Sequence, residues 1–462
     1  MIGLRDASRL TRESLLVPRG KVVKVVGLVI EATSRSAALG DLCQIFCGRG
    51  LSRGNGESGA ADGTPGRRGD GSERLRSILA EVVGFRDGRL LLTPLGDTEG
   101  VAPGAAVISL GRPLDVPVGG SLLGRVLDAL GRPIDGRGSL GRTRRMASRS
   151  IAPDPLARRR VSEPLATGVR AIDAMLTVGL GQRIGIFSGS GVGKSTLLGM
   201  IARRTEADVN VIGLIGERGR EVREFIERDL GPEGLQRSVL VVATADAPPQ
   251  IRRQAAFTAT TIAEWFRDQG RRVLVLMDSV TRFATAQREI GLATGEPPTT
   301  RGYTPSVFTQ LSRLLERSGT SPGDGAITGL YTVLVEGDDH SEPVADAARS
   351  ILDGHIVLSR ELAERGHYPA VDVLASVSRC MPDVVREEHA DAAQAMRSLL
   401  AAHRDVSPLL ALAAYRAGAL PEADRAIGRW PRIEAFLRQG RDEATSFAST
   451  VAELRTLVSG EP

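Results

Sequence analysis

Short apolar runs separated by glycine and aspartate turns dominate the first hundred or so residues of the chain. The runs at residues 22–30, 78–84 and 89–93 have the length and the composition of β-strands. Several short strands within about ninety residues are typical of a small barrel. The pattern therefore predicts an N-terminal β-barrel domain over residues 1–110.

One stretch interrupts this pattern of strands. Residues 48–71 contain nine glycines among serine, aspartate, asparagine and arginine. A segment with so little apolar content cannot form a packed core, so we expect a flexible glycine-rich insertion at a strand connection. Its arginines could contact acidic lipid or RNA, but a solvated loop is the simpler interpretation.

Apolar runs of strand length alternate with helical stretches in the middle of the chain. Four such runs lie at residues 208–215, 238–243, 272–277 and 328–335. Strands that alternate with helices form a parallel sheet with both faces covered. We therefore predict a central α/β domain with a mostly parallel sheet over residues 111–380.

The last part of the chain has a different pattern. After Pro382 the sequence becomes rich in alanine, leucine and arginine at helical spacing, with late prolines at Pro421 and Pro431. This spacing predicts a small C-terminal α-helical domain over residues 381–462. The expected fold class is thus multidomain, with a barrel, an α/β domain and a helical domain.

The charge and the aromatic content of the chain argue against a nucleic-acid partner. The chain has 462 residues, 42% of them hydrophobic, and a formal net charge of only +5. So slight a charge implies no obligatory nucleic-acid partner. Phe46 and Phe85 are the only aromatic residues up to Ser150, whereas barrels that bind single strands need stacking rings. We expect no nucleic-acid binding by the barrel.

Cysteine content and hydropathy indicate the compartment. Cys43, Cys47 and Cys380 are too few for a disulfide framework, which favours a reducing cytoplasm. The Cys43 and Cys47 pair could be metal ligands, but without a second pair nearby we interpret them as small buried residues. No run is long and apolar enough to span a membrane, so we expect a soluble protein that can still dock on one.

A glycine-rich turn joins the apolar run at residues 184–187 to a predicted helix at residues 196–202. Glycines let the backbone curl until several N–H groups point at one centre, and the helix N-terminus adds its positive end. This arrangement is typical of a phosphate-binding loop. We predict that the nucleotide is bound by Ser188, Gly189, Ser190, Gly191, Val192, Gly193, Lys194, Ser195 and Thr196.

Two side chains of this loop carry the expected chemistry. In such loops the lysine, here Lys194, reaches the β- and γ-phosphates, and the hydroxyl of Ser195 is a ligand of Mg²⁺. Of 60 basic residues only Lys21, Lys24 and Lys194 are lysines. A planar guanidinium does not replace a compact ammonium at such a position. Ser188 stands where the first glycine is usual, and a small residue satisfies that position.

Acidic residues follow the apolar strands at the edge where ligands bind in an open α/β sheet. Asp278 follows residues 272–277 and is predicted to hold Mg²⁺ directly or through water. Glu217 follows another strand and is predicted to polarise the attacking water, while Arg218 beside it can contact the γ-phosphate. The alternative for Asp278 is a turn residue at the strand end, and the alternative for Glu217 is a surface ion pair. For Glu336, after a third strand, a plain acidic loop is an equal alternative.

Several longer motifs make the chain similar to the catalytic subunits of rotary ATPases. Within that superfamily, the phosphate-loop residues 189–193 resemble the flagellar protein-export branch more than the virulence-secretion branch. The resemblance extends from about Val22 to Arg379 and is weak over the C-terminal helices. The motifs that carry it are residues 216–222, 295–305, 352–360, 368–372 and 376–379.

The resemblance implies roles for particular residues. It implies a RecA-like P-loop domain with ATP and Mg²⁺ as ligands and with Glu217 as the catalytic glutamate. It implies that Arg379 is an arginine finger that enters the neighbouring subunit's site, so that a homo-hexameric ring is needed for full activity. It further implies that Tyr368 stacks on adenine and that residues 295–305 face a central stalk.

The function implied is ATP hydrolysis that energises export of flagellar proteins. The implied partners are other copies of the chain, stalk and regulator proteins of the export apparatus, and export chaperones with their flagellar substrates. The expected location is the cytoplasm, with peripheral association with the inner membrane at the flagellar base.

Three alternatives remain open from the sequence. A virulence-type secretion ATPase shares all of this chemistry and differs only in the amino-acid sequence of the phosphate loop. A hexameric nucleic-acid translocase shares the ring and the core, but residues 295–305 offer only Arg301 as a basic residue. A non-catalytic regulatory subunit usually lacks the lysine or the glutamate, and this chain has both Lys194 and Glu217.

Overall fold

The computed structural model describes residues 19–33, 37–47, 76–335 and 342–459 of the chain. Two predicted features, the glycine-rich segment at residues 48–71 and the acidic loop at Glu336, lie outside the described residues.

The chain divides into two compact units. One contains the residues up to Leu114 together with Ala293–Gly295, and the other contains Asp115–Leu292 and Glu296–Pro462. The expected boundaries at residues 110 and 380 stay predictions.

The first unit is a closed barrel of six antiparallel strands in the order β1-β2-β5-β4-β3-β6. The apolar run at residues 22–30 includes the tight turn between the first two of these strands, where Gly27 has a positive φ of 54°. The strands are β1 (Arg19–Val26), β2 (Val29–Thr33), β3 (Leu42–Phe46), β4 (Ser77–Arg86), β5 (Arg89–Pro94) and β6 (Ala106–Ser109).

Alternating side chains of these strands fill the barrel core. Cys43 is fully buried and Cys47 is 2% exposed, both packed in the barrel's cluster of buried apolar side chains. Burial raises the pKa of the Cys43 thiol to about 11, so this side chain behaves as a small apolar group. The predicted barrel and the predicted burial of the two cysteines are confirmed.

The second unit is built on a sheet of nine strands, whose main order is β17-β16-β10-β15-β13-β11-β12-β8. The six strands from β16 to β12 in this order pair in parallel. At one end of the sheet, β17 pairs antiparallel with β16. The strands are β8 (Val126–Asp128), β10 (Arg183–Ser188), β11 (Val209–Glu217), β12 (Ser238–Thr244), β13 (Arg272–Asp278), β14 (Gly319–Thr320), β15 (Ala326–Leu334), β16 (Gly354–Leu358) and β17 (Val371–Ser378). The predicted mostly parallel sheet is confirmed.

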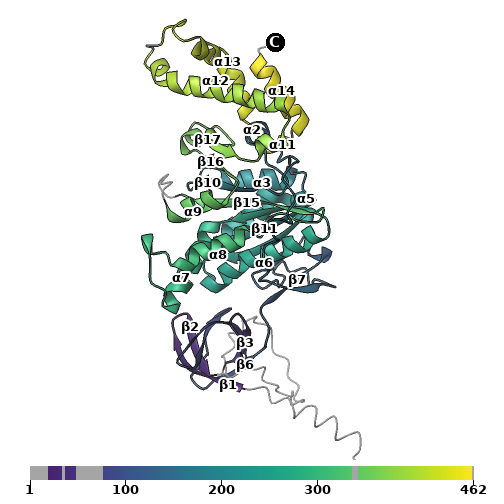
Figure 1. Ribbon diagram of the computed structural model, residues 1–462, viewed down its shortest axis with the longest axis vertical. Coiled ribbons are helices and arrows are strands. Elements are labelled where there is room, and N and C mark those ends of the chain that lie inside the picture. Colours follow the sequence, from purple (N-terminus) through teal and green to yellow (C-terminus); the bar gives the residue numbers. More distant parts are fainter. Residues whose placement is uncertain (1–18, 34–36, 48–75, 336–341, 460–462) are drawn as a thin grey trace, which may run out of the picture. The chain divides into compact units, whose positions relative to one another are not determined.

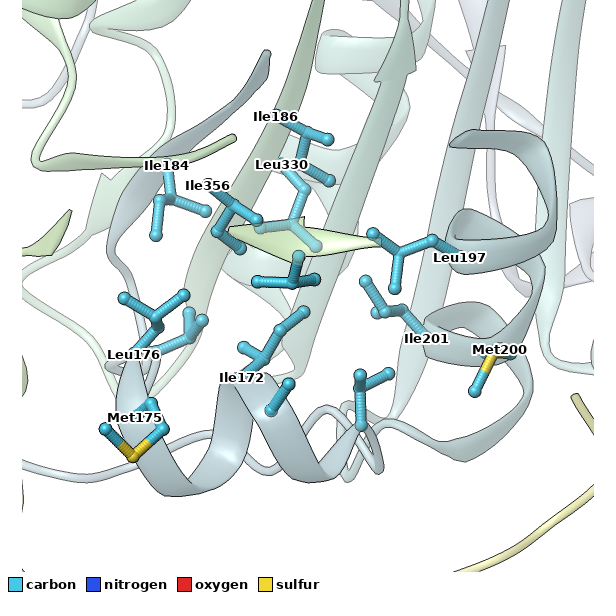
Figure 2. Packing of buried hydrophobic residues seen from close by; sticks show 14 of the residues in the cluster. Ile172, Met175, Leu176, Ile184, Ile186, Leu197, Met200, Ile201, Leu330 and Ile356 are labelled. Carbon is cyan, nitrogen blue, oxygen red and sulfur yellow. The ribbon is translucent and has the colours of Figure 1, made fainter. Parts of the chain in front are cut away.

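Helices cover both faces of this sheet (Figure 1). On one face, Ile184 and Ile186 of the sheet pack with Ile172 and Leu197 of helices α2 (Arg170–Met175) and α3 (Lys194–Arg204), as Figure 2 shows. The other face packs against four helices of a second buried cluster. These are α6 (Pro249–Asp268), α7 (Val280–Thr294), α8 (Pro305–Leu315) and α9 (Pro343–Ile351).

Short elements complete the α/β part. A two-stranded ribbon pairs β7 with β9. The remaining elements are β7 (Asp115–Val118), η1 (Gly120–Leu122), β9 (Arg144–Ala147), α4 (Gly219–Glu224), η2 (Phe225–Leu230), α5 (Gly231–Gln236), η3 (Thr300–Gly302), α10 (Arg360–Glu364) and α11 (Met381–Val384).

Three helices close the chain and pack on the α/β part. Buried apolar residues such as Met396, Phe436 and Leu454 belong to the same cluster as the strands β10 and β16. No helix among the described residues is long and apolar enough to cross a membrane. The helices are α12 (Glu387–Ala411), α13 (Pro421–Leu437) and α14 (Phe447–Ser459). The predicted C-terminal helical domain is confirmed.

A buried ion pair joins three segments on the face covered by α6 and α8. The guanidinium of Arg317 donates to both carboxylate oxygens of Glu264 at 2.8 and 2.6 Å, and also to the carbonyl of Ser148. The side chains of Arg317 and Glu264 are only 2% and 1% exposed. Removal of one partner would leave the other charge buried without compensation.

We therefore expect Arg317→Ala to lower the free energy of unfolding by about 3–5 kcal/mol. Arg365→Ala is the matched control, because Arg365 pairs with Glu361 on the surface and such pairs contribute at most about 1 kcal/mol. Urea unfolding followed by tryptophan fluorescence measures both, since Trp265 lies next to Glu264 in α6. Equal losses in the two variants would contradict the energetic role of the buried pair.

Candidate active site

The predicted phosphate-binding loop connects the end of β10 to the start of α3, in the middle of the parallel sheet. Val192 is 2% exposed and packs in the core beneath the loop, which anchors it. Ser190, Gly191 and Ser195 are exposed at the carboxyl edge of the sheet. The loop therefore presents its backbone and hydroxyl groups where ligands bind in open α/β sheets.

Two glycines of the loop have backbone conformations that favour glycine. Gly191 has a φ of 80° and Gly193 has a φ of 89°. Ser188, which ends the strand, is 2% exposed, and among the described residues its Oγ has no hydrogen-bond partner. A small residue fits this buried position, as the sequence predicts.

The ammonium of Lys194 lies between two carboxylates that come from neighbouring strands. Its Nζ donates to Oδ1 of Asp278, the last residue of β13, and lies 3.6 Å from Oε1 of Glu217, the last residue of β11. The same Oδ1 of Asp278 accepts a hydrogen bond of 2.7 Å from the hydroxyl of Thr332. The fold thus brings together three residues that the sequence predicts as catalytic or metal-binding.

Burial sets the protonation of this cluster. Desolvation, together with the neighbouring charge of Asp278, raises the pKa of Glu217 to about 7, although the Lys194 ammonium opposes the shift. A carboxyl group with a pKa near neutrality exchanges a proton readily at physiological pH, which suits a group that activates water. Asp278 itself is 4% exposed and is held by Lys194 and Thr332.

Two arginines lie beside this cluster. Arg218 is exposed and donates to Oε1 of Glu221 at 3.3 Å. The side chain of Arg282, in the first turns of α7, packs against Gly216, because a Cβ added at Gly216 would lie 2.9 Å from its Cβ. The strand end that carries Glu217 is thus flanked by one guanidinium and by the aliphatic stem of another.

Tyr368 lies against the phosphate loop. A Cβ added at Gly193 would lie 3.2 Å from the Cε1 atom of the Tyr368 ring, and the tyrosine is 46% exposed. The residue precedes β17, and this strand begins beside Leu358, which in turn pairs with Ser188. An exposed ring at the edge of the loop is positioned to face a ligand.

Arg379 lies at the other end of the same strand. Ser378 pairs with Gly354, the first residue of β16, whereas Leu358 at the end of β16 pairs with Ser188. Four residues of strand separate these pairs by about 13 Å. The side chain of Arg379 is exposed, and it has no hydrogen-bond or ion-pair partner among the described residues. The predicted site residues therefore divide between two edges of the sheet.

The residues at the loop fit a magnesium-bound nucleoside triphosphate. The positive φ of Gly191 and Gly193, the ammonium of Lys194 and the free hydroxyl of Ser188 or Ser195 suit an anion. In the described part of the chain no group of three histidine, cysteine, aspartate or glutamate residues could hold a metal alone. Mg²⁺ in nucleotide sites needs only one or two protein ligands, because the phosphates supply others.

The sequence did not identify Thr332 or Arg282 as parts of the site. Thr332 reaches Asp278 only because β15 is the neighbour of β13, which no local pattern indicates. Arg282 lies in the first turn of α7, but Asp278 ends the preceding strand, so no helical spacing indicated that Arg282 packs against Gly216.

Comparison with known families supports the same chemistry. Residues 168–378 match the model of the ATP synthase alpha/beta family, nucleotide-binding domain. Residues 68–111 match the beta-barrel domain of that family, and residues 385–456 match the T3SS EscN ATPase C-terminal domain. The three matched segments follow the order of the barrel, the sheet and the closing helices.

Individual relatives resemble the chain over nearly its full length. The "Flagellum-specific ATP synthase" of Bacillus subtilis is 50% identical, and the match covers 96% of this chain and 95% of that protein. The "Type 3 secretion system ATPase" of Xanthomonas euvesicatoria is also 50% identical, with 96% and 94% covered.

A solved structure, the assembled ATPase EscN in complex with its central stalk EscO from the enteropathogenic E. coli type III secretion system, has a TM-score of 0.83 and 42% identity. The match covers 95% of this chain and 100% of that chain. The chain therefore belongs to the ATP synthase alpha/beta family, together with the flagellum-specific and type 3 secretion system ATPases, and is an ATP-hydrolysing enzyme.

Proposed function

We propose that this chain forms a homo-hexameric ring whose Mg²⁺-dependent ATP hydrolysis energises the export of flagellar proteins. The observation that carries the proposal is the ammonium of Lys194 between the strand-end carboxylates of Asp278 and Glu217. Relatives of the same family that are named for flagella support the flagellar system. So do the phosphate-loop residues 189–193, which resemble the flagellar branch. The virulence-type alternative has relatives of equal identity.

In this proposal the phosphate loop holds the triphosphate. Backbone N–H groups of residues 189–193 and the start of α3 surround the phosphates, and Lys194 turns from Asp278 to the β- and γ-phosphates. Ser195 and Asp278 would hold Mg²⁺, whose charge offsets that of the phosphates. Thr332 keeps the carboxylate of Asp278 oriented through its hydrogen bond.

Glu217 is proposed to polarise the attacking water. Its position at a strand end and its pKa of about 7 allow the carboxylate to accept a proton from water at the γ-phosphate. Arg218 is proposed to leave its exposed pair with Glu221 and to contact the γ-phosphate, which costs little because exposed pairs are weak.

The opposite placement of Tyr368 and Arg379 supports a site shared between subunits. Tyr368 serves the site of its own chain as a platform for adenine. Arg379 lies about 13 Å away along the strands and has an exposed side chain, so it is proposed to enter the neighbouring subunit's site. There its guanidinium offsets the charge that develops on the transferred phosphoryl group.

The partners follow from this assignment. Residues 295–305 are proposed to face a stalk protein in the ring, as the complex of EscN with its central stalk suggests. We also propose an export regulator, export chaperones and flagellar substrates as partners, and no nucleic acid. The proposed location is the cytoplasm, at the inner membrane of the flagellar base.

The first test removes the charge of Glu217. We expect E217Q to reduce the turnover of ATP at least about a hundredfold, because general-base contributions are typically of that size or larger. Binding of Mg-ATP, measured by calorimetry, should persist because the phosphate loop is unchanged. Glu227→Gln is the matched control, because Glu227 is exposed and pairs with Arg223 on the surface, and it should keep turnover within about twofold. Near-normal turnover of E217Q would refute the assignment.

The second test addresses sharing of the site. Arg379→Ala should lower specific ATPase activity about a thousandfold or more, as loss of an arginine finger does. Lys194→Ala should be equally inactive, because its own loop is disabled. In a one-to-one mixture, roughly a quarter of the sites combine an intact loop with a neighbour's intact Arg379, given head-to-tail contacts in a ring.

Activity should therefore return when the two inactive variants are mixed, to about a quarter of the wild-type value. The specific activity of the wild-type chain should also rise cooperatively with protein concentration. A mixture as inactive as its components, together with a flat concentration profile, would show that Arg379 does not act between subunits.

A further inference from the structure

We propose that Gln439 is a positioning residue, which holds Tyr368 over the phosphate loop and thereby sets the affinity of the site for the base of the nucleotide. The inference rests on the proposed role of Tyr368 as an adenine platform. Gln439 lies in the loop after α13, far in sequence from both Tyr368 and the phosphate loop.

All polar groups of the Gln439 side chain are satisfied in a buried setting. The residue is 4% exposed. Its Oε1 accepts a hydrogen bond of 2.8 Å from the backbone N–H of Arg170, and its Nε2 donates to the carbonyls of Gly168 and Glu443, each at 2.9 Å. A buried amide with every bond made has one orientation, so the backbone of Gln439 is fixed in place.

That backbone holds Tyr368. The N–H of Gln439 donates to the carbonyl oxygen of Tyr368 at 2.9 Å. The tyrosine lies outside the strand β17, which begins only at Val371, and its ring is half exposed. The bond from Gln439 therefore fixes the segment that carries the ring against Gly193.

The partners of Gln439 are themselves rigid. The carboxylate of Asp173, which is 1% exposed, accepts from the N–H and the hydroxyl of Thr167 and from the N–H of Gly168. Gly168 has a φ of 74°, and a Cβ there would lie 2.5 Å from the Cβ of Arg204. The carbonyl that receives the Gln439 amide thus belongs to a turn with no room to shift.

Arginines from α2 and α3 hold the rest of the loop. The guanidinium of Arg170 donates to the carbonyls of Phe436 at 3.0 Å and Arg438 at 2.5 Å. Arg203 and Arg204 donate to the carbonyl of Arg441 at 2.8 and 3.2 Å. Because α3 begins at Lys194, the loop that carries Gln439 is attached to the same helix that presents the phosphate-binding lysine.

The hydrogen-bond network around Gln439 joins two segments of the chain that match different domain families. Tyr368 lies in the segment that matches the nucleotide-binding domain, whereas Gln439 lies in the segment that matches the C-terminal domain. Gln439 bonds to the segment that carries Tyr368 and to no residue of the phosphate loop, so its side chain should affect affinity for the base and leave affinity for the phosphates unchanged.

The experiment compares a ligand with a base and a ligand without one. Binding of Mg-ADP and of Mg-pyrophosphate to the full chain is measured by calorimetry, because neither ligand is hydrolysed. Q439L should weaken ADP binding about tenfold, the loss expected when a stacking platform is displaced. Pyrophosphate affinity should change less than about twofold. The exposed Gln394→Leu on α12 is the control and should change neither.

A double-mutant cycle identifies the route of action. Tyr368→Leu should weaken ADP binding to a similar extent, and Q439L should add no further loss in that background. An additional loss in the double variant, or an equal loss of pyrophosphate binding in Q439L, would overturn the positioning role. If Tyr368→Leu weakens ADP binding and Q439L does not, this inference alone fails. If Tyr368→Leu has no effect, the proposed adenine platform fails as well.

Discussion

The contact of one ammonium with two strand-end carboxylates is the interaction on which the rest of this structure depends. Asp278 and Glu217 come from neighbouring strands and lie in a partly desolvated setting, where two negative charges alone would repel each other. Lys194 offsets this repulsion and is fixed by the helix that it begins. The strand order β10, β15, β13, β11 in the sheet brings Lys194, Asp278 and Glu217 together.

The antiparallel strand β17 has a predicted site residue next to each of its ends, and these ends lie at opposite edges of the sheet. The start of β17 places Tyr368 at the phosphate loop, and its end places Arg379 at the opposite edge. Because β17 is antiparallel to β16, it begins at the edge where β16 ends, whereas a parallel strand would first need a crossover to the other edge. The segment from Tyr368 to Arg379 thus places one exposed side chain beside the chain's own phosphate loop and another at the opposite edge of the sheet.

Local patterns were sufficient to predict the barrel, the parallel sheet and the groups that depend on strand ends. The phosphate loop is encoded within nine consecutive residues, and Asp278 and Glu217 each follow an apolar run. Thr332 and Gln439 could not be found in this way, because their partners are set by strand order and by a loop 71 residues from Tyr368. A satisfied buried amide has no signature in a single sequence, since any polar residue in a loop looks the same.

The arginine bias of the chain clarifies why the phosphate loop has a lysine. Several arginines bind backbone carbonyls with a planar fork, as Arg170, Arg203 and Arg317 do in holding distant segments together. Such a fork makes several directed bonds and fixes its partners. At the phosphate loop the proposed role of Lys194 is to exchange carboxylate oxygens for phosphate oxygens, and a compact ammonium with freely rotating donors suits that role because it needs no rearrangement of the backbone. Arginine therefore suits positions that hold segments of the chain in place, and lysine suits the one position of the site where the cation is proposed to change partners.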